Sequence, residues 1–343
     1  MKRAGLFDVE DRRRKLLATR DFLDRVNRFV AWESFRPLLD TALKRSERKK
    51  GGRPAHDAVL MFKVLVLQAL YNLSDEQTEY QILDRQSFMM FLGLELCDTV
   101  PDARTIWLFR ETLRKAGAIE ELFAHFDGML AAQGFKASGG QLIDATFVEV
   151  PRQRNTHDEN DAIKEGKIPE AWDDKKKAHK DTDARWTKKN GMSFYGYKNH
   201  ANVDRTHKFI RRYMVTDASV HDSQELETIL DPNNEQELWA DSAYRSEEQE
   251  ARLKERGITS HIHERAYRNK PLTEEQKSKN KEKSSVRARV EHVFGHIEVS
   301  MHGCFVRTIG LARAKAKVGL ECLAYNISRL TSLMRHPARN APA

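Results

Sequence analysis

Residues 141–150 read Gln-Leu-Ile-Asp-Ala-Thr-Phe-Val-Glu-Val, and this stretch decides the fold. Its β-branched and apolar side chains, bounded by Gly139-Gly140 and Pro151, predict a strand. The chain before it reads as helix, whereas the chain after it reads as strands alternating with helices. One carboxylate, Asp144, lies inside the apolar run, where burial is costly unless a cation compensates the charge.

The chain before this strand, residues 1–136, predicts an all-α domain. Asp57 is expected to cap a helix whose apolar positions run from Val59 to Leu70. A second helix is predicted after Ser74, which has Gln77 three residues later in the capping-box pattern. The apolar window is too short for a membrane span, so no membrane association is expected.

The chain after residue 136 predicts a mixed sheet. The order is three strands, helix, strand, helix, strand and helix, which predicts an α+β domain over residues 137–343 with helices on both faces. The predicted strands are 141–150, 194–203 and 209–216 (the last two joined as a hairpin), 237–240 and 259–263. The predicted helices are 223–230, 247–256, the helix that contains residue 291, and a C-terminal helix at 311–334. Residues 152–190 are expected to be a mobile charged loop, and residues 265–289 a basic loop.

Charge points to a polyanionic partner. The chain has 59 Lys and Arg against 51 Asp and Glu, a formal net charge of +8. From Arg12 to Arg53 there are 14 basic residues against 5 acidic ones, which favours a DNA-facing arm over a plain solvated surface. Three scattered cysteines and a charged N-terminus without an apolar leader predict a cytoplasmic protein in a reducing compartment.

A helix is predicted over residues 285–298, with its apolar residues on one face. These are Val286, Val290, Val293, Phe294 and Ile297. Arg287, Glu291 and Glu298 follow the edge of that face, so a carboxylate held by rigid packing can still point into a cleft.

Three acids are candidates for a metal site. Asp144 lies in the first strand, Asp241 follows the apolar strand at 237–240, and Glu291 lies on the late helix, 97 and 50 residues apart along the chain. Convergent carboxylates favour a hard cation, Mg²⁺ or Mn²⁺, and two such ions suit phosphoryl transfer. Taken singly, each acid is more often a helix cap or a salt-bridged residue, and spacing alone does not decide between these interpretations.

A family resemblance adds what spacing cannot. The chain resembles insertion-sequence transposases of the Asp-Asp-Glu type, in particular the insertion-sequence-five family, over nearly its whole length. The resemblance is carried by Gly52-Arg53-Pro54-Ala55-His56-Asp57, Met61-Phe62-Lys63, Val100-Pro101-Asp102, Thr105-Ile106, Leu142-Ile143-Asp144-Ala145-Thr146, Tyr197-Lys198-Asn199-His200, Ala240-Asp241-Ser242-Ala243-Tyr244 and Arg287-x-x-x-Glu291.

The resemblance implies a ribonuclease-H-like catalytic core in which Asp144, Asp241 and Glu291 hold two divalent ions. It places Arg287 near DNA phosphate, and Lys198 and His200 in the DNA channel. Arg53 and Arg289 lie in the basic stretches and complete the predicted DNA-binding set. The implied function is cut-and-paste DNA transposition by a homodimer that binds terminal inverted repeats and target DNA, in a bacterial cytoplasm and associated with the nucleoid.

Two positions depart from the family pattern. Relatives often have tyrosine three residues before the arginine and lysine seven residues after the glutamate, where this chain has Ser284 and Glu298. These residues bear on how a flipped or hairpinned DNA end is held, and not on the three acids.

Two other functions remain alternatives. His292 and His296 are four residues apart on a helix, as in a zinc-binding pair, although no His-Glu-x-x-His run is present. A domesticated DNA-binding protein with the same fold and no catalysis is the second, although such a binder has no need of buried acids.

Overall fold

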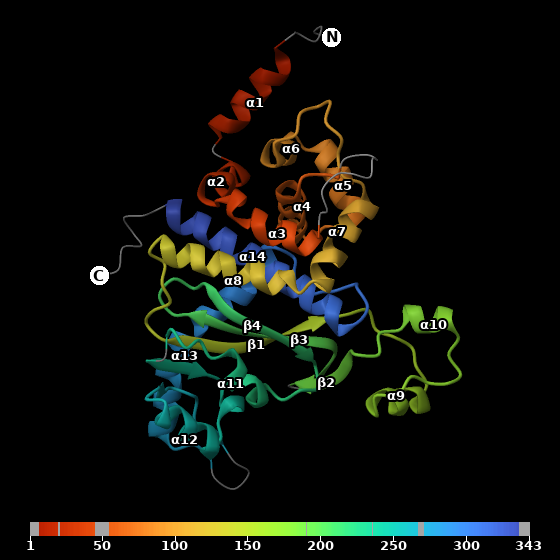
Figure 1. Cartoon of the computed structure of the whole chain (residues 1–343). Coiled ribbons are helices and arrows are strands. Elements are labelled where there is room, and N and C mark those ends of the chain that lie inside the picture. The colour runs from red at the N-terminus through yellow and green to blue at the C-terminus, as the bar shows by residue number, and fades with distance from the viewer. Residues whose placement is uncertain are drawn as a thin grey trace. The chain divides into compact units, whose positions relative to one another are not determined.

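The computed structural model describes residues 7–19, 21–44, 55–189, 191–234, 236–266 and 271–335 (Figure 1). The chain divides into two compact units. The first comprises Met1–Gly128 together with Leu323–Ala343, and the second comprises Met129–Cys322. The division thus falls a few residues before the predicted boundary at 136, and the C-terminal residues group with the helical unit.

The first unit is helical. Its helices are α1 (Asp8–Ala18), α2 (Phe22–Phe29), the 3₁₀ helix η1 (Trp32–Phe35), α3 (Arg36–Leu43), α4 (Ala58–Tyr71), α5 (Asp75–Asp84), α6 (Gln86–Leu92), α7 (Ala103–Lys115) and α8 (Ala118–Ala132), the last of which continues into the second unit. The predicted caps are present, because the Asp57 side chain accepts from the backbone N–H groups of Val59 and Leu60, and Ser74 accepts from that of Gln77.

The core of this unit is built on α4, in which every residue from Val64 to Leu70 is buried. Aromatic rings pack against it: Phe35 and Phe62 have ring centroids 4.9 Å apart, and Trp32 lies edge-on to Phe62 at 5.9 Å. Among the described helices, none alone is long and apolar enough to cross a membrane, although α4 and α5, bent by 102°, meet that test together.

The second unit is built on a six-stranded mixed sheet in the order β2-β3-β1-β5-β6, with β4 also paired to β3. Its strands are β1 (Gln141–Glu149), β2 (Arg185–Lys189), β3 (Met192–Asp204), β4 (Ile210–Asp217), β5 (Glu237–Ala240) and β6 (Thr259–Ser260). β1 is antiparallel to β3 and parallel to β5, so the first predicted strand lies at the centre of the sheet.

Helices cover both faces of this sheet. These are α11 (Leu226–Ile229) after the 3₁₀ helix η2 (Asp222–Glu225), α12 (Glu247–Glu255) after the 3₁₀ helix η3 (Ser242–Tyr244), α13 (Glu274–Gly295) with the π-helical turn η4 (His296–Ser300), and the beginning of α14 (Leu311–Arg335). On β3, Asn202 donates to the Ile229 carbonyl of α11, whereas Asn199, on the opposite face by strand alternation, contacts Cys322 of α14. The predicted α+β class, helical first and then a mixed sheet with helices, is confirmed.

Two predicted loops contain regular structure. Residues 152–190 form α9 (His157–Lys164), α10 (Asp174–His179) and β2, and Figure 1 shows α9 and α10 beside the sheet. The predicted basic loop at 265–289 is helical from Glu274 onward, since α13 begins with a capping box between Thr273 and Gln276.

Candidate functional site

Asp144 lies on the central strand β1, directly beyond the last residue pair that β1 forms with β5. Its side chain is 15% exposed, and its Oδ1 accepts a hydrogen bond from the backbone N–H of Ala145 at 2.9 Å. Burial raises the pKa of the Asp144 carboxyl, while the positive charge of Arg287 opposes that shift. The site therefore holds a carboxylate that depends on a neighbouring cation.

Asp241 is the residue after β5, and the register between β1 and β5 places it next to Asp144. Ile143 pairs with Ala240 in the parallel β1–β5 ladder, so the two aspartates follow the same rung on neighbouring strands. Asp241 Oδ1 caps η3 by accepting from the Ser242 N–H at 2.6 Å. Its negative charge also contributes to the raised pKa of Asp144, behind burial, which is the main cause.

Glu291 and Arg287 lie one turn apart on α13. The helix is held by Val290, Val293 and Phe294, all of which are buried as predicted. Arg287 Nη1 donates to Asp144 Oδ2 at 2.8 Å, and its Nη2 donates to Glu291 Oε1 at 3.3 Å. One guanidinium thus joins two of the three predicted acids.

Two further side chains belong to this site that the sequence interpretation did not assign to it. Tyr244 is fully buried, and its hydroxyl has no hydrogen-bond partner among the described residues. Burial raises the pKa of Tyr244 well above its ordinary value, and the charges of Asp222, Asp144 and Asp241 act in the same direction. The signal was present in the sequence, because Tyr244 closes the Ala240–Tyr244 motif.

The second is His263. Burial lowers the pKa of His263, and the positive charge of Arg287 lowers it further. The neutral imidazole is therefore favoured beside the guanidinium at neutral pH. No sequence pattern distinguished this histidine from a surface residue.

The donor set suits a hard divalent cation, because all three predicted ligands offer carboxylate oxygens. In the described parts of the chain, however, no three His, Cys, Asp or Glu side chains are grouped closely enough to hold a metal ion. Arg287 is bonded to two of the acids. Arg287 therefore supplies the positive charge next to Asp144 and Glu291.

Lys198 and His200 lie in the interior. Lys198 is 8% exposed. Its Nζ donates to the Val220 carbonyl at 2.7 Å and forms an ion pair with Asp222 at 2.9 Å. His200 is fully buried, with Nε2 at 2.9 Å from the Thr216 hydroxyl. Strand alternation on β3 directs both side chains away from the face shared by Asp144, so they support the sheet, and their predicted contact with DNA remains a prediction that this geometry disfavours.

Arg289 is exposed on α13 and donates to the Arg205 carbonyl at 3.0 Å. Arg53 lies outside the described residues. Arg289 is therefore the member of the predicted DNA-binding set that the structure places on the surface.

The two residues that differ from the family pattern, Ser284 and Glu298, also lie on this part of the chain. Ser284 Oγ donates to the Asn280 carbonyl at 2.8 Å along α13, and Glu298 lies in the π-helical turn η4. His292, of the alternative zinc pair, has Nδ1 at 3.2 Å from Lys208 Nζ, and a cation in that position competes with a metal ion.

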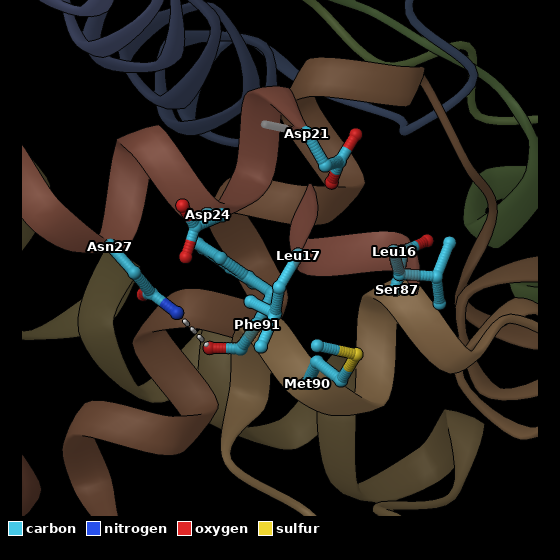
Figure 2. Close-up of a pocket in the computed structure, with 8 residues that line it drawn as sticks. All are labelled: Leu16, Leu17, Asp21, Asp24, Asn27, Ser87, Met90 and Phe91. Atoms are coloured by element: carbon cyan, nitrogen blue, oxygen red, sulfur yellow. Dashed lines mark hydrogen bonds between the residues drawn. The ribbon is translucent and has the colours of Figure 1, made fainter. Parts of the chain in front are cut away.

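A separate cavity of about 60 Å³ lies in the helical unit, between α1, α2 and α6 (Figure 2). Its lining is mostly apolar, and Asn27 donates to the Phe91 carbonyl at 2.8 Å. None of the three predicted acids lines this cavity. It is therefore distinct from the candidate catalytic site.

Comparison with known families finds two matching domains in the chain. Residues 136–327 match the family described as Transposase DDE domain, and residues 11–112 match the family described as Transposase domain (DUF772). The first match contains Asp144, Asp241 and Glu291. No solved structure matches the chain.

Proposed function

The chain belongs to the insertion-sequence transposases with a DDE catalytic domain, and we propose that it binds the terminal inverted repeats of its element and catalyses DNA cleavage and strand transfer. The observation that carries this proposal is the junction of β1, β5 and α13. There, Asp144 and Asp241 follow one rung of two parallel strands, and Arg287 joins Asp144 to Glu291.

Asp144, Asp241 and Glu291 are the proposed ligands of two divalent ions, Mg²⁺ or Mn²⁺, which this family generally uses. When bound, such ions activate the attacking hydroxyl or water and stabilise the leaving oxygen. The backbone N–H groups of Ala145 and Ser242 fix the orientation of the two aspartates. Two of the three ligands are thus pre-oriented by main-chain contacts, which supports precise positioning of the reacting phosphate.

The proposed role of Arg287 is to bind DNA phosphate, for which a guanidinium offers two parallel donors. Arg289, exposed on the same helix, is a second proposed DNA contact. The basic arm from Arg12, with Arg53, is the proposed site for the element ends. Assembly as a homodimer on DNA, a place in the cytoplasm with the nucleoid, and membership of the insertion-sequence-five family belong to this proposal.

The test compares two glutamates of α13 in a strand-cleavage assay with Mg²⁺ and a duplex taken from the boundary of the encoding element. Glu291→Gln is expected to lower cleavage by about a thousandfold, because a neutral amide is a poor ligand for a hard cation. Glu282→Gln, an exposed position on the same helix, is the control and is expected to cleave like the wild type.

If the chain binds DNA without catalysis, the wild type will bind the duplex and leave it uncut, as will both variants. Equal cleavage by the wild type and Glu291→Gln would remove Glu291 from the proposed site. Because both glutamates lie on α13, Glu282→Gln shows whether the loss of a negative charge on this helix is enough to lower cleavage.

A further inference from the structure

The guanidinium of Arg287 is held between a buried acid and a more exposed one. Its side chain is 17% exposed, as against 15% for Asp144 and 58% for Glu291. The contact with Asp144 is 2.8 Å and the contact with Glu291 is 3.3 Å. The tighter contact is therefore the one farther from solvent.

These contacts conflict with metal binding. The Ala145 N–H occupies only one lone pair of Asp144 Oδ1, whereas Arg287 places a full positive charge against Oδ2. A divalent ion on the same carboxylate would lie within a few ångströms of the guanidinium, and like charges at that distance repel strongly in a site shielded from water. Asp144 thus has either Arg287 or a metal ion as its main counter-charge.

Neither Arg287 nor a metal ion can move away from Asp144 unless another positive charge replaces it. A buried carboxylate that loses its partner is strongly destabilised, as is a buried guanidinium. The Nε of Arg287 is itself buried and has no hydrogen-bond partner among the described residues, so its present contacts satisfy the group only in part. A phosphate group offers the guanidinium two parallel hydrogen bonds and an opposite charge.

We propose that Arg287 is a positioning residue that neutralises Asp144 and Glu291 in the free protein and moves to a DNA phosphate on binding, so that DNA raises the affinity of the acids for a divalent ion. This inference rests on the proposed metal site. Linkage makes the effect reciprocal, so the divalent ion also strengthens DNA binding. The free protein is consequently kept from loading metal before DNA is in place.

The experiment measures Mn²⁺ binding to the full chain by electron paramagnetic resonance, with and without the duplex from the element boundary. Without DNA, Arg287→Gln is expected to bind Mn²⁺ about tenfold more tightly than the wild type, within the usual range of coupling between sites. DNA is expected to tighten Mn²⁺ binding by a similar factor in the wild type and not in Arg287→Gln.

Lys281→Gln is the control, because it removes a positive charge from an exposed position on the same helix and leaves the acids in place. It is expected to bind Mn²⁺ like the wild type when DNA is absent. Arg287→Lys keeps the charge but replaces the rigid planar fork with a flexible point charge that is less pre-organised between the two carboxylates, so an intermediate Mn²⁺ affinity is expected. This variant also serves if Arg287→Gln does not fold, as judged by circular dichroism.

Two failures are distinguishable. Equal Mn²⁺ affinity of the wild type, Arg287→Gln and Arg287→Lys without DNA, or equal tightening by DNA in all of them, would overturn the role of Arg287. If Asp144→Asn added to Arg287→Gln or Arg287→Lys left Mn²⁺ binding unchanged, the proposed metal site itself would be wrong.

Discussion

His200 shows what burial does to a single ionisable side chain. Burial lowers its pKa to about 4, from an ordinary value of 6.5. Between these pH values the histidine is protonated in the unfolded chain but neutral in the folded chain. The free energy of unfolding is therefore not reduced by this group above about pH 6.5, and it falls as the pH drops toward 4.

From this difference we predict that His200→Gln is less sensitive to acid than the wild type. Its amide can replace the contact of Nε2 with Thr216. Between about pH 7 and about pH 5, this group should lower the free energy of unfolding of the wild type by about 2 kcal/mol, and most of that loss should disappear in the variant. Urea unfolding at about pH 7 and about pH 5 measures this, and parallel losses in both proteins would contradict the buried neutral histidine.

One pair of substitutions tests whether Lys198 stabilises the fold or contacts DNA. Lys198→Met leaves the Asp222 carboxylate, 18% exposed, without its ammonium partner, and is expected to destabilise the protein by about 3 kcal/mol. Adding Asp222→Asn should recover a large part of that loss. If Lys198 contacts DNA, Lys198→Met will instead weaken duplex binding while leaving the unfolding free energy unchanged.

At the level of secondary-structure elements, the close pairing of β3 with β1 depends on one glycine of the β2–β3 hairpin. Gly196 has φ 147°, and a Cβ at this position would overlap the Val148 carbonyl of β1. Gly191, at the turn of the same hairpin, has φ 80° but open space around it. Backbone strain is thus common to both positions, whereas the steric clash occurs at only one.

Gly196→Ala is accordingly expected to destabilise the protein by at least about 2 kcal/mol more than Gly191→Ala, which carries only the strain of a positive φ, about 1 kcal/mol. Thermal or urea unfolding of the two variants provides the comparison. Similar losses would mean that β1 and β3 separate easily at this point.

The elements that sequence predicted well are those that bury an apolar pattern. β5 was predicted at its observed bounds because Leu238, Trp239 and Ala240 are all buried. α9 and α10 were missed because they are short and polar, and their ends are fixed by the side chains of Thr156 and Asp173 rather than by a core. The first three turns of α13 were missed for a related reason, since none of the residues before Val290 is buried.

The candidate site was predictable only in part. The resemblance supplied the three acids and Arg287, but spacing along the chain could not show that strand register brings Asp241 beside Asp144. Nor could it show that Arg287 contacts the acids in the free protein. His263 was missed because its part in the site arises from burial next to charges, which is a property of the folded chain alone. Tyr244 was quoted within the Ala240–Tyr244 motif, but only the fold shows its burial beside the acids.

At the scale of the whole molecule, a net charge of +8 predicts DNA binding that weakens with salt. Each phosphate contact contributes about −0.9 to the slope of log affinity against log salt concentration. We expect Arg289→Gln to make that slope shallower by about this amount. The control is a substitution of Arg252, an exposed arginine on α12 that is paired with Glu248, by glutamine. If the affinity of the wild type did not change with salt concentration, the predicted electrostatic contribution to DNA binding would be wrong.

The central position of β1 has a consequence for the chain as it leaves the ribosome. β1 is synthesised before all its partners, yet β5 begins about a hundred residues later and α13 later still. Contacts so remote in sequence form late and slowly. A truncated translation product that stops between residues 204 and 237 therefore pairs β1 with β3 on one side, leaves its other edge without β5, and lacks two of the three proposed metal ligands, Asp241 and Glu291.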